Sequence, residues 1–112
     1  MKYLILACLL FASPAWGAVA LDSSSASTCA NTTSPYSWTS HTIAGSNRLL
    51  VVPVEIRDDT ITVTGITYGG VALTKLDSQL NPPGLLSLEL WYLKAPNTGT
   101  GTIQVTLSAN PT

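Results

Sequence analysis

The chain has 112 residues with 46% hydrophobic and only 10% charged residues, and its formal net charge at pH 7 is -1. This composition excludes a basic nucleic-acid-binding surface, which needs clustered lysine and arginine, and a highly charged disordered chain. With two cysteines and one histidine, it also excludes a disulfide-rich scaffold and a structural zinc site.

Residues 1–20 have the pattern of an export signal peptide. Lys2 is a short positive region, residues 3–12 are apolar, and small residues precede a cleavage site after Ala20. A second possible cleavage site follows Gly17. The apolar run is about half of the ~20 residues that a membrane-spanning helix needs. We therefore expect a secreted or cell-surface bacterial protein with no membrane span after cleavage.

The two cysteines raise separate questions. Cys8 ends a sequence that looks like a lipoprotein box, but the apolar stretch before it is shorter than the usual ~7–15 residues, so we expect no lipidation. After signal removal, Cys29 is a buried small side chain, a free thiol or an intermolecular partner. Residues 21–34 are small and polar and predict a flexible lead. The folded module is then expected at residues 35–112.

From Tyr36 onward the sequence has the two-residue period of β-strands. Apolar and polar residues alternate in short runs, and residues typical of turns separate these runs. In chain order, we expect strands at residues 36–43, 48–57, 61–68, 71–77, 85–93 and 102–107. This spacing predicts an all-β fold, an antiparallel β-sandwich of immunoglobulin-like or jelly-roll-like type.

Four residues predict local features of these strands. Pro53 cannot donate to a ladder, which predicts an edge strand or a bulge. Apolar parity shifts after Gly65, which predicts a bulge there. Gly69 and Gly70 predict a two-residue hairpin turn. Tyr68 comes just before that turn, and its hydroxyl needs a partner or water if it is buried.

The run at residues 85–93 has two different faces. One face is a row of large apolar side chains: Leu86, Leu88, Leu90 and Tyr92. Glu89 and Trp91 lie on the opposite face, which we expect to point outward. An outward aromatic ring beside polar groups can stack on a sugar, so Trp91 and Glu89 are our candidate ligand-binding residues. The alternative is that Trp91 packs under a loop or against the second sheet.

Other polar residues give weaker signals. Asp58 and Asp59 are expected to form a solvated turn rather than a calcium site, because no spaced Asp-x-Asp-x-Asp pattern is present. Glu55 and Glu89 raise the possibility of a paired-carboxylate glycosidase, but both lie within strands among apolar neighbours. His41 has no acidic partner nearby in the sequence. We expect no catalytic residue, no metal site and no cofactor.

Four runs together resemble a group of β-sandwich modules in bacterial secreted and cell-surface proteins, many known only as hypothetical proteins. The runs are HTIAGSNRLLVV at 41–52, VTGITYGGVALT at 63–74, ELWYL at 89–93 and GTGTIQVTLS at 99–108. The resemblance covers residues 36–108 and implies fold and export, but no activity or catalytic residue. Such modules continue with a further strand or two, whereas this sequence stops at Thr112. Two interpretations are a truncated reading frame and a fragment of a longer protein.

The leading functional prediction is an exported, non-catalytic module for adhesion or carbohydrate binding at the bacterial surface. Its expected partner is a polysaccharide or cell-surface glycan, and not a nucleic acid. The main alternative is a structural spacer, or a truncated fragment without its own ligand. A small secreted glycoside hydrolase is the last alternative.

Overall fold

The computed structural model describes residues 19–28, 33–58, 60–81 and 86–110. Residues 1–18 of the predicted signal peptide lie outside the described residues, and so do Cys29 and Asp59. The described part of the chain is all-β, without a helix. Accordingly, it has no helix of the length and hydropathy that crossing a membrane requires.

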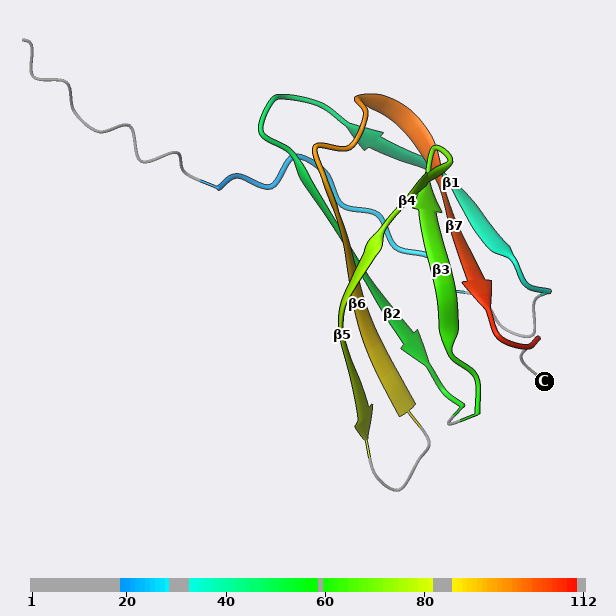
Figure 1. Cartoon of the computed structure of the whole chain (residues 1–112). Coiled ribbons are helices and arrows are strands. Elements are labelled where there is room, and N and C mark those ends of the chain that lie inside the picture. Colours follow the sequence, from blue (N-terminus) through cyan, green and yellow to red (C-terminus); the bar gives the residue numbers. More distant parts are fainter. Residues whose placement is uncertain (1–18, 29–32, 59, 82–85, 111–112) are drawn as a thin grey trace, which may run out of the picture.

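The described strands form two antiparallel sheets that face one another (Figure 1). One sheet has the order β1-β7-β3-β4 and the other β2-β6-β5. The strands are β1 (Tyr36–Ile43), β2 (Leu49–Ile56), β3 (Val63–Tyr68), β4 (Val71–Ala72), β5 (Thr74–Asn81), β6 (Leu86–Lys94) and β7 (Gly99–Leu107). The arrangement is sandwich-like, because apolar side chains from both sheets make one core between them.

Several local predictions are confirmed. The strands expected at 36–43, 48–57, 61–68 and 85–93 match β1, β2, β3 and β6 within two residues at each end. Pro53 lies on β2, an edge strand of its sheet. The pairing of β3 with β7 shifts register between Val63 and Gly65, which is the expected bulge. Gly69 and Gly70 have φ of 54° and 83° and connect β3 to β4 as a tight turn.

The strand expected at 71–77 is wrong in one respect, because the chain changes sheets within it. β4 pairs with β3 in the first sheet through only two residue pairs, and β5 pairs with β6 in the second. The crossing occurs at Leu73, a buried residue whose N–H donates to the carbonyl of Ile66 at 2.8 Å. As a result, the first half of β3 has no strand on its β4 side among the described residues.

Tyr68 fixes one end of the core. Its ring is 3% exposed, and its hydroxyl donates to the carbonyl of Gly99 at 2.9 Å, with the carbonyl of His41 at 3.2 Å. Gly101 leaves the space for this ring, since a Cβ at that position would lie 2.7 Å from ring carbons of Tyr68. Gly101 lies within the final strand, which begins at Gly99, earlier than the expected residue 102.

The described part of the N-terminal lead, residues 19–28, contains no strand, but side-chain hydrogen bonds tie it to β1 and the turn after it. The carboxylate of Asp22 accepts from the N–H of Ala44 at 2.7 Å, and the hydroxyl of Ser23 donates to the carbonyl of Thr42. Side-chain hydrogen bonds thus hold the lead along β1, in place of the backbone hydrogen bonds of a paired strand.

Candidate ligand-binding pocket

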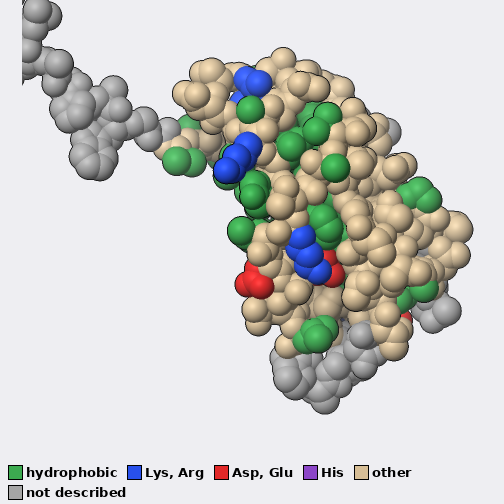
Figure 2. Space-filling model, viewed as in Figure 1, with side chains coloured by type: hydrophobic (Ala, Val, Ile, Leu, Met, Phe, Trp, Pro, Cys, Tyr) green, Lys and Arg blue, Asp and Glu red, His purple; other side chains and the backbone are tan. Residues whose placement is uncertain are grey.

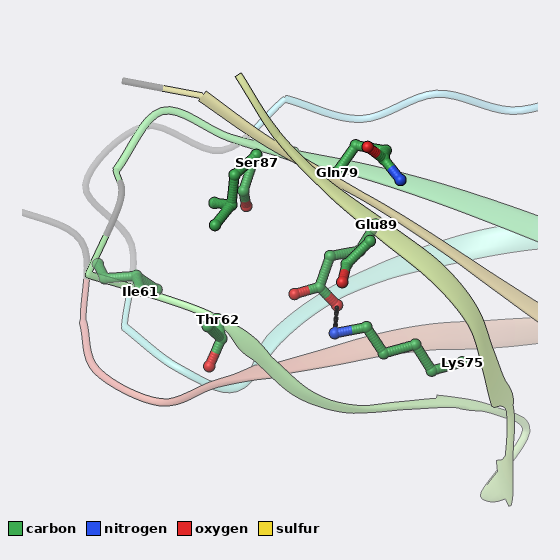
Figure 3. Close-up of a pocket in the computed structure, with 8 residues that line it drawn as sticks. Ile61, Thr62, Lys75, Gln79, Ser87 and Glu89 are labelled. Carbon is green, nitrogen blue, oxygen red and sulfur yellow. Dashed lines mark ion pairs between the residues drawn. The ribbon is translucent and has the colours of Figure 1, made fainter. Parts of the chain in front are cut away.

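A pocket of about 130 Å³ lies between the two sheets beside the edge strand β5 (Figure 3). Its walls come from the segment before β3, from β5 and from β6. The lining residues are Ile61, Thr62, Lys75, Ser78, Gln79, Leu80, Ser87 and Glu89. The lining residues nearest to β3, Ile61 and Thr62, come just before that strand begins.

Trp91 and Glu89 do lie together, but the expectation that they face solvent is wrong. Trp91 is 7% exposed and Glu89 is 2% exposed, and both point into the space between the sheets. The apolar row on the other face of β6 is the outer one, where Leu88 is 48% exposed. Trp91 packs in the core and is not an outward platform for a sugar ring.

Three donors explain why the polar face of β6 can be buried. Oε1 of Glu89 accepts from the N–H of Val63 at 3.2 Å, and Oε2 accepts from Nε1–H of Trp91 at 3.0 Å. Nζ of Lys75 lies 3.0 Å from the same Oε2. A buried carboxylate costs several kcal/mol unless such partners surround it. Here Glu89 connects β6 to both β3 and β5.

Lys75 comes from the edge strand and reaches into the pocket. Its side chain is 38% exposed, and Nζ lies 5.8 Å from the centroid of the Trp91 ring, within the range of a cation–π interaction. Lys75 and Trp91 are direct cross-strand partners between β5 and β6. Because Lys75 is partly exposed, its ammonium can still donate to a molecule entering from solvent.

Ser87 is the lining residue that the fold itself does not explain. It is 5% exposed, and its Oγ has no hydrogen-bond partner among the described residues. A buried hydroxyl without a partner costs about 1–3 kcal/mol. Ser87 lines the pocket (Figure 3), but its Oγ is itself covered by neighbouring atoms and is not presented to a bound molecule.

The sequence did not single out Lys75 or Ser87 as functional. Lys75 continues the strand row of Val71 and Leu73, and Glu89 lies inside an apolar strand. The available signal was a pair of opposite charges, Lys75 in the row of Val71 and Leu73 and Glu89 in the row of Trp91, since charged residues are stable inside a protein only when they are paired.

His41 lies within β1 and is 7% exposed. Its Nδ1 lies 2.8 Å from Oγ of Ser25 in the lead, and its ring meets that of Tyr68 edge-on. In the described part of the chain, no acidic side chain hydrogen-bonds to His41. The contact with Ser25 therefore joins the lead to β1 without forming a catalytic triad.

Asp58 forms the expected turn. Its Oδ1 accepts from the hydroxyl of Thr60 at 2.6 Å and from the N–H of Thr60 at 2.8 Å. These bonds, the side-chain bond first, hold the pKa of Asp58 below the ordinary value of 3.8. Among the described residues, no group of three or more His, Cys, Asp or Glu side chains is placed to hold a metal ion.

Lys and Arg side chains are scattered over the face seen in Figure 2 rather than gathered in a patch.

No protein-family model, curated protein or solved structure matches the chain. The residues of the pocket therefore carry the functional argument by themselves.

Proposed function

We propose that the chain is an exported, non-catalytic module that binds carbohydrate at the bacterial surface, in adhesion, through the pocket beside β5. The observation that carries the proposal is the partly exposed ammonium of Lys75, which lines the pocket and is held in place by the buried carboxylate of Glu89. The earlier idea that Trp91 stacks on the sugar is replaced by this pocket. The export signal and the resemblance at residues 36–108 support the surface location.

The chemistry of the pocket suits hydroxyl groups. A sugar hydroxyl can accept a hydrogen bond, and the pocket offers the ammonium of Lys75 as a donor. Leu80 also lines the pocket and is 67% exposed, so it offers an apolar contact for sugar C–H groups.

The size of the pocket limits what enters it. A volume of about 130 Å³ is well below the ~300–1,000 Å³ of pockets that enclose a whole small-molecule ligand. We therefore propose that a hydroxymethyl arm or a pair of hydroxyls enters, while the remainder of the glycan stays outside. The described lining includes one carboxylate, Glu89, and three donors already occupy it. A paired-carboxylate hydrolysis needs two, so this lining supports binding over catalysis.

The strand order supports the jelly-roll-like form of the fold over the immunoglobulin-like form. β1 pairs with β7, and β2 pairs with β6, so the first strands lie beside the last strands of the described chain. Nested pairings of this kind are typical of a jelly roll.

The test is a titration of the ¹⁵N-labelled protein with methyl glycosides of glucose, galactose and mannose, followed by amide chemical shifts. We expect shifts at Lys75, Gln79 and Ser87 with at least one sugar, and their loss in Lys75→Met, which removes the ammonium from the pocket wall. The matched control is Lys94→Met, which removes an exposed ammonium from the end of β6. Shifts that persist in Lys75→Met would refute the pocket as the site.

The alternative, a structural spacer, has one observation in its favour. Glu89 makes three contacts that join β6 to β3 and β5, so the ion pair with Lys75 also has a purely structural use. A spacer predicts no chemical shift change at the pocket with any of the three sugars.

A further inference from the structure

We infer that the outer face of the β2-β6-β5 sheet binds the same face of a second copy of this chain, so that the protein forms a symmetric dimer. The inference goes beyond the proposed function and does not depend on the pocket, which lies on the inner side of this sheet.

The outer face of β6 is a row of apolar side chains. Its outward positions are Leu86, Leu88, Leu90 and Tyr92. Leu88 is 48% exposed, and the other three are half-buried. The contacts of Glu89 explain this arrangement, because they make the polar positions of the strand the inward ones. Four large apolar side chains therefore face away from the core of the described fold.

β2 extends this apolar surface across the sheet. Leu49 and Val51 are 61% and 46% exposed, and Pro53 is exposed as well. Val51 and Pro53 are direct cross-strand partners of Tyr92 and Leu90. The outward apolar side chains of β2 and β6 thus form one continuous apolar patch. Large contiguous patches of this kind mark interaction surfaces in soluble proteins.

The rim of the apolar patch is polar. On β5, the outward cross-strand partners of the apolar row are Thr74, Asp77 and Gln79. Lys94 lies at one end of the face, because it pairs with the first residue of β2, and Glu55 lies near the other end. An apolar centre inside a polar rim is the usual anatomy of a protein–protein interface.

A second copy fits this face in shape and area. Two sheets pack face to face ~10 Å apart, with strand directions within about 30° of each other. The outward side chains of the three strands leave roughly 600 Å² for contact, so two such faces bury roughly 1,200 Å², the lower end of specific interfaces. We therefore expect a dimer with a Kd on the order of 10 μM.

Charge favours one arrangement of the two copies. If the two-fold axis crosses the strands, the faces meet with their strand ends exchanged, and Lys94 of each copy lies near Glu55 of the other. An axis along β6 would instead bring the two Lys94 side chains together, which is unfavourable. Glu55 contacts Arg57 through Oε1 and is 51% exposed, so a second cation can reach its carboxylate.

Sedimentation velocity measures the association. We expect the mass of the protein to rise from monomer to dimer between about 1 and 200 μM and to rise no further, because a contact between identical faces closes on itself. Leu88→Lys puts a charge within the apolar patch and should weaken the dimer about thirtyfold. The matched control is Leu80→Lys, at a 67% exposed leucine that pairs with the inward Ser87. It should dimerise as the original protein does.

Val51→Lys and Val71→Lys form a second matched pair. Val51 lies in the apolar patch and is 46% exposed, whereas Val71 lies on β4 in the other sheet and is 42% exposed. We expect Val51→Lys to weaken the dimer and Val71→Lys to leave it unchanged. This pair decides the question if Leu88→Lys does not fold, as its amide spectrum would show.

The arrangement of the two copies has its own test. Lys94→Glu should weaken the dimer about threefold, because it sets like charges against each other at an exposed site. Adding Glu55→Lys to that variant should restore the original Kd. A double variant that stays as weak as Lys94→Glu overturns the arrangement with exchanged strand ends.

The outcomes separate this inference from the proposed function. A protein that stays monomeric at every concentration overturns the dimer and leaves the sugar site standing. A dimer that neither Leu88→Lys nor Val51→Lys weakens overturns the assigned face. Growth beyond a dimer also contradicts the inference, because it requires contacts between different surfaces.

Discussion

Ser87 and Glu89 lie two residues apart on the inward face of β6, but their surroundings differ. Glu89 has three donors around its carboxylate, from Val63, Lys75 and Trp91. Ser87 is as deeply buried but has no partner among the described residues. The described contacts therefore account for the burial of the Glu89 carboxylate, while none of them pairs the hydroxyl of Ser87.

Removal of the Glu89 carboxylate should destabilise the protein. Glu89→Ala leaves the N–H of Val63 and the Nε1–H of Trp91 buried without an acceptor, and we expect a loss of about 3–5 kcal/mol in the free energy of unfolding. Glu55→Ala is the control, since this side chain is about half exposed and its contact with Arg57 is worth less than about 1 kcal/mol. Urea denaturation measures both. Equal losses in the two variants would contradict the structural role of Glu89.

The turn at Asp58 gives a test by pH. The hydroxyl of Thr60 is the main cause of the lowered pKa of Asp58. Thr60→Val should therefore raise that pKa toward 3.8, as ¹³C NMR of the carboxyl group would show, while Thr106→Val should leave it unchanged. A carboxyl whose pKa is lowered on folding stabilises the protein above its unfolded pKa, and this contribution is lost as the pH falls through the lowered pKa. An unchanged pKa in Thr60→Val would be contrary to the turn described here.

At the scale of the strands, the inward and outward rows decide stability. Leu50 on β2 is 6% exposed, whereas Leu88 on β6 is 48% exposed. Leu50→Ala should cost about 2–5 kcal/mol, as for other buried leucines, and Leu88→Ala less than about 1 kcal/mol. Urea denaturation of the two variants compares the same chemical change on the two faces. A larger loss for Leu88→Ala would mean that β6 has the opposite orientation.

Alternation predicted the position of most strands, because each run keeps its two-residue period between residues typical of turns. It did not predict the change of sheets at Leu73, because the period continues through that residue and only β4 and β5 together show that the chain has crossed. It also placed the start of the final strand too late, since Gly99 and Gly101 are residues typical of loops, whereas here they pair with β1.

For the pocket, the sequence correctly placed Glu89 and Trp91 on one face, since they are two residues apart in a strand. It could not say which face of β6 is buried. Hydrophobicity assigned the leucine row to the core, but the contacts of Glu89 with Lys75 and Val63 come from strands far away in the chain. Only the three-dimensional arrangement shows that these partners make the polar face the inner one.

At the scale of the whole molecule, the two sides of the sandwich-like fold differ. On the side of β1, the lead contributes hydrogen bonds from Asp22, Ser23 and Ser25. On the opposite side, every described side chain of β5 itself is exposed, and the pocket opens beside this strand. An edge strand leaves backbone N–H and C=O groups unpaired, and the charges and register shift at Lys75 and Asp77 hinder the pairing of β5 with another chain. The exposed side of the molecule is thus also the side that carries the candidate ligand site.

The most direct test of the pocket as a ligand site is the free energy of unfolding of Lys75→Met, measured with and without the tightest-binding methyl glycoside. Without sugar, we expect this variant to be less stable than the original protein, because the buried carboxylate of Glu89 loses its charged partner. With sugar at ten times the Kd of the original protein, the original protein should gain about 1.4 kcal/mol and the variant should gain nothing. A variant that gains as much from the sugar as the original protein does would contradict the account.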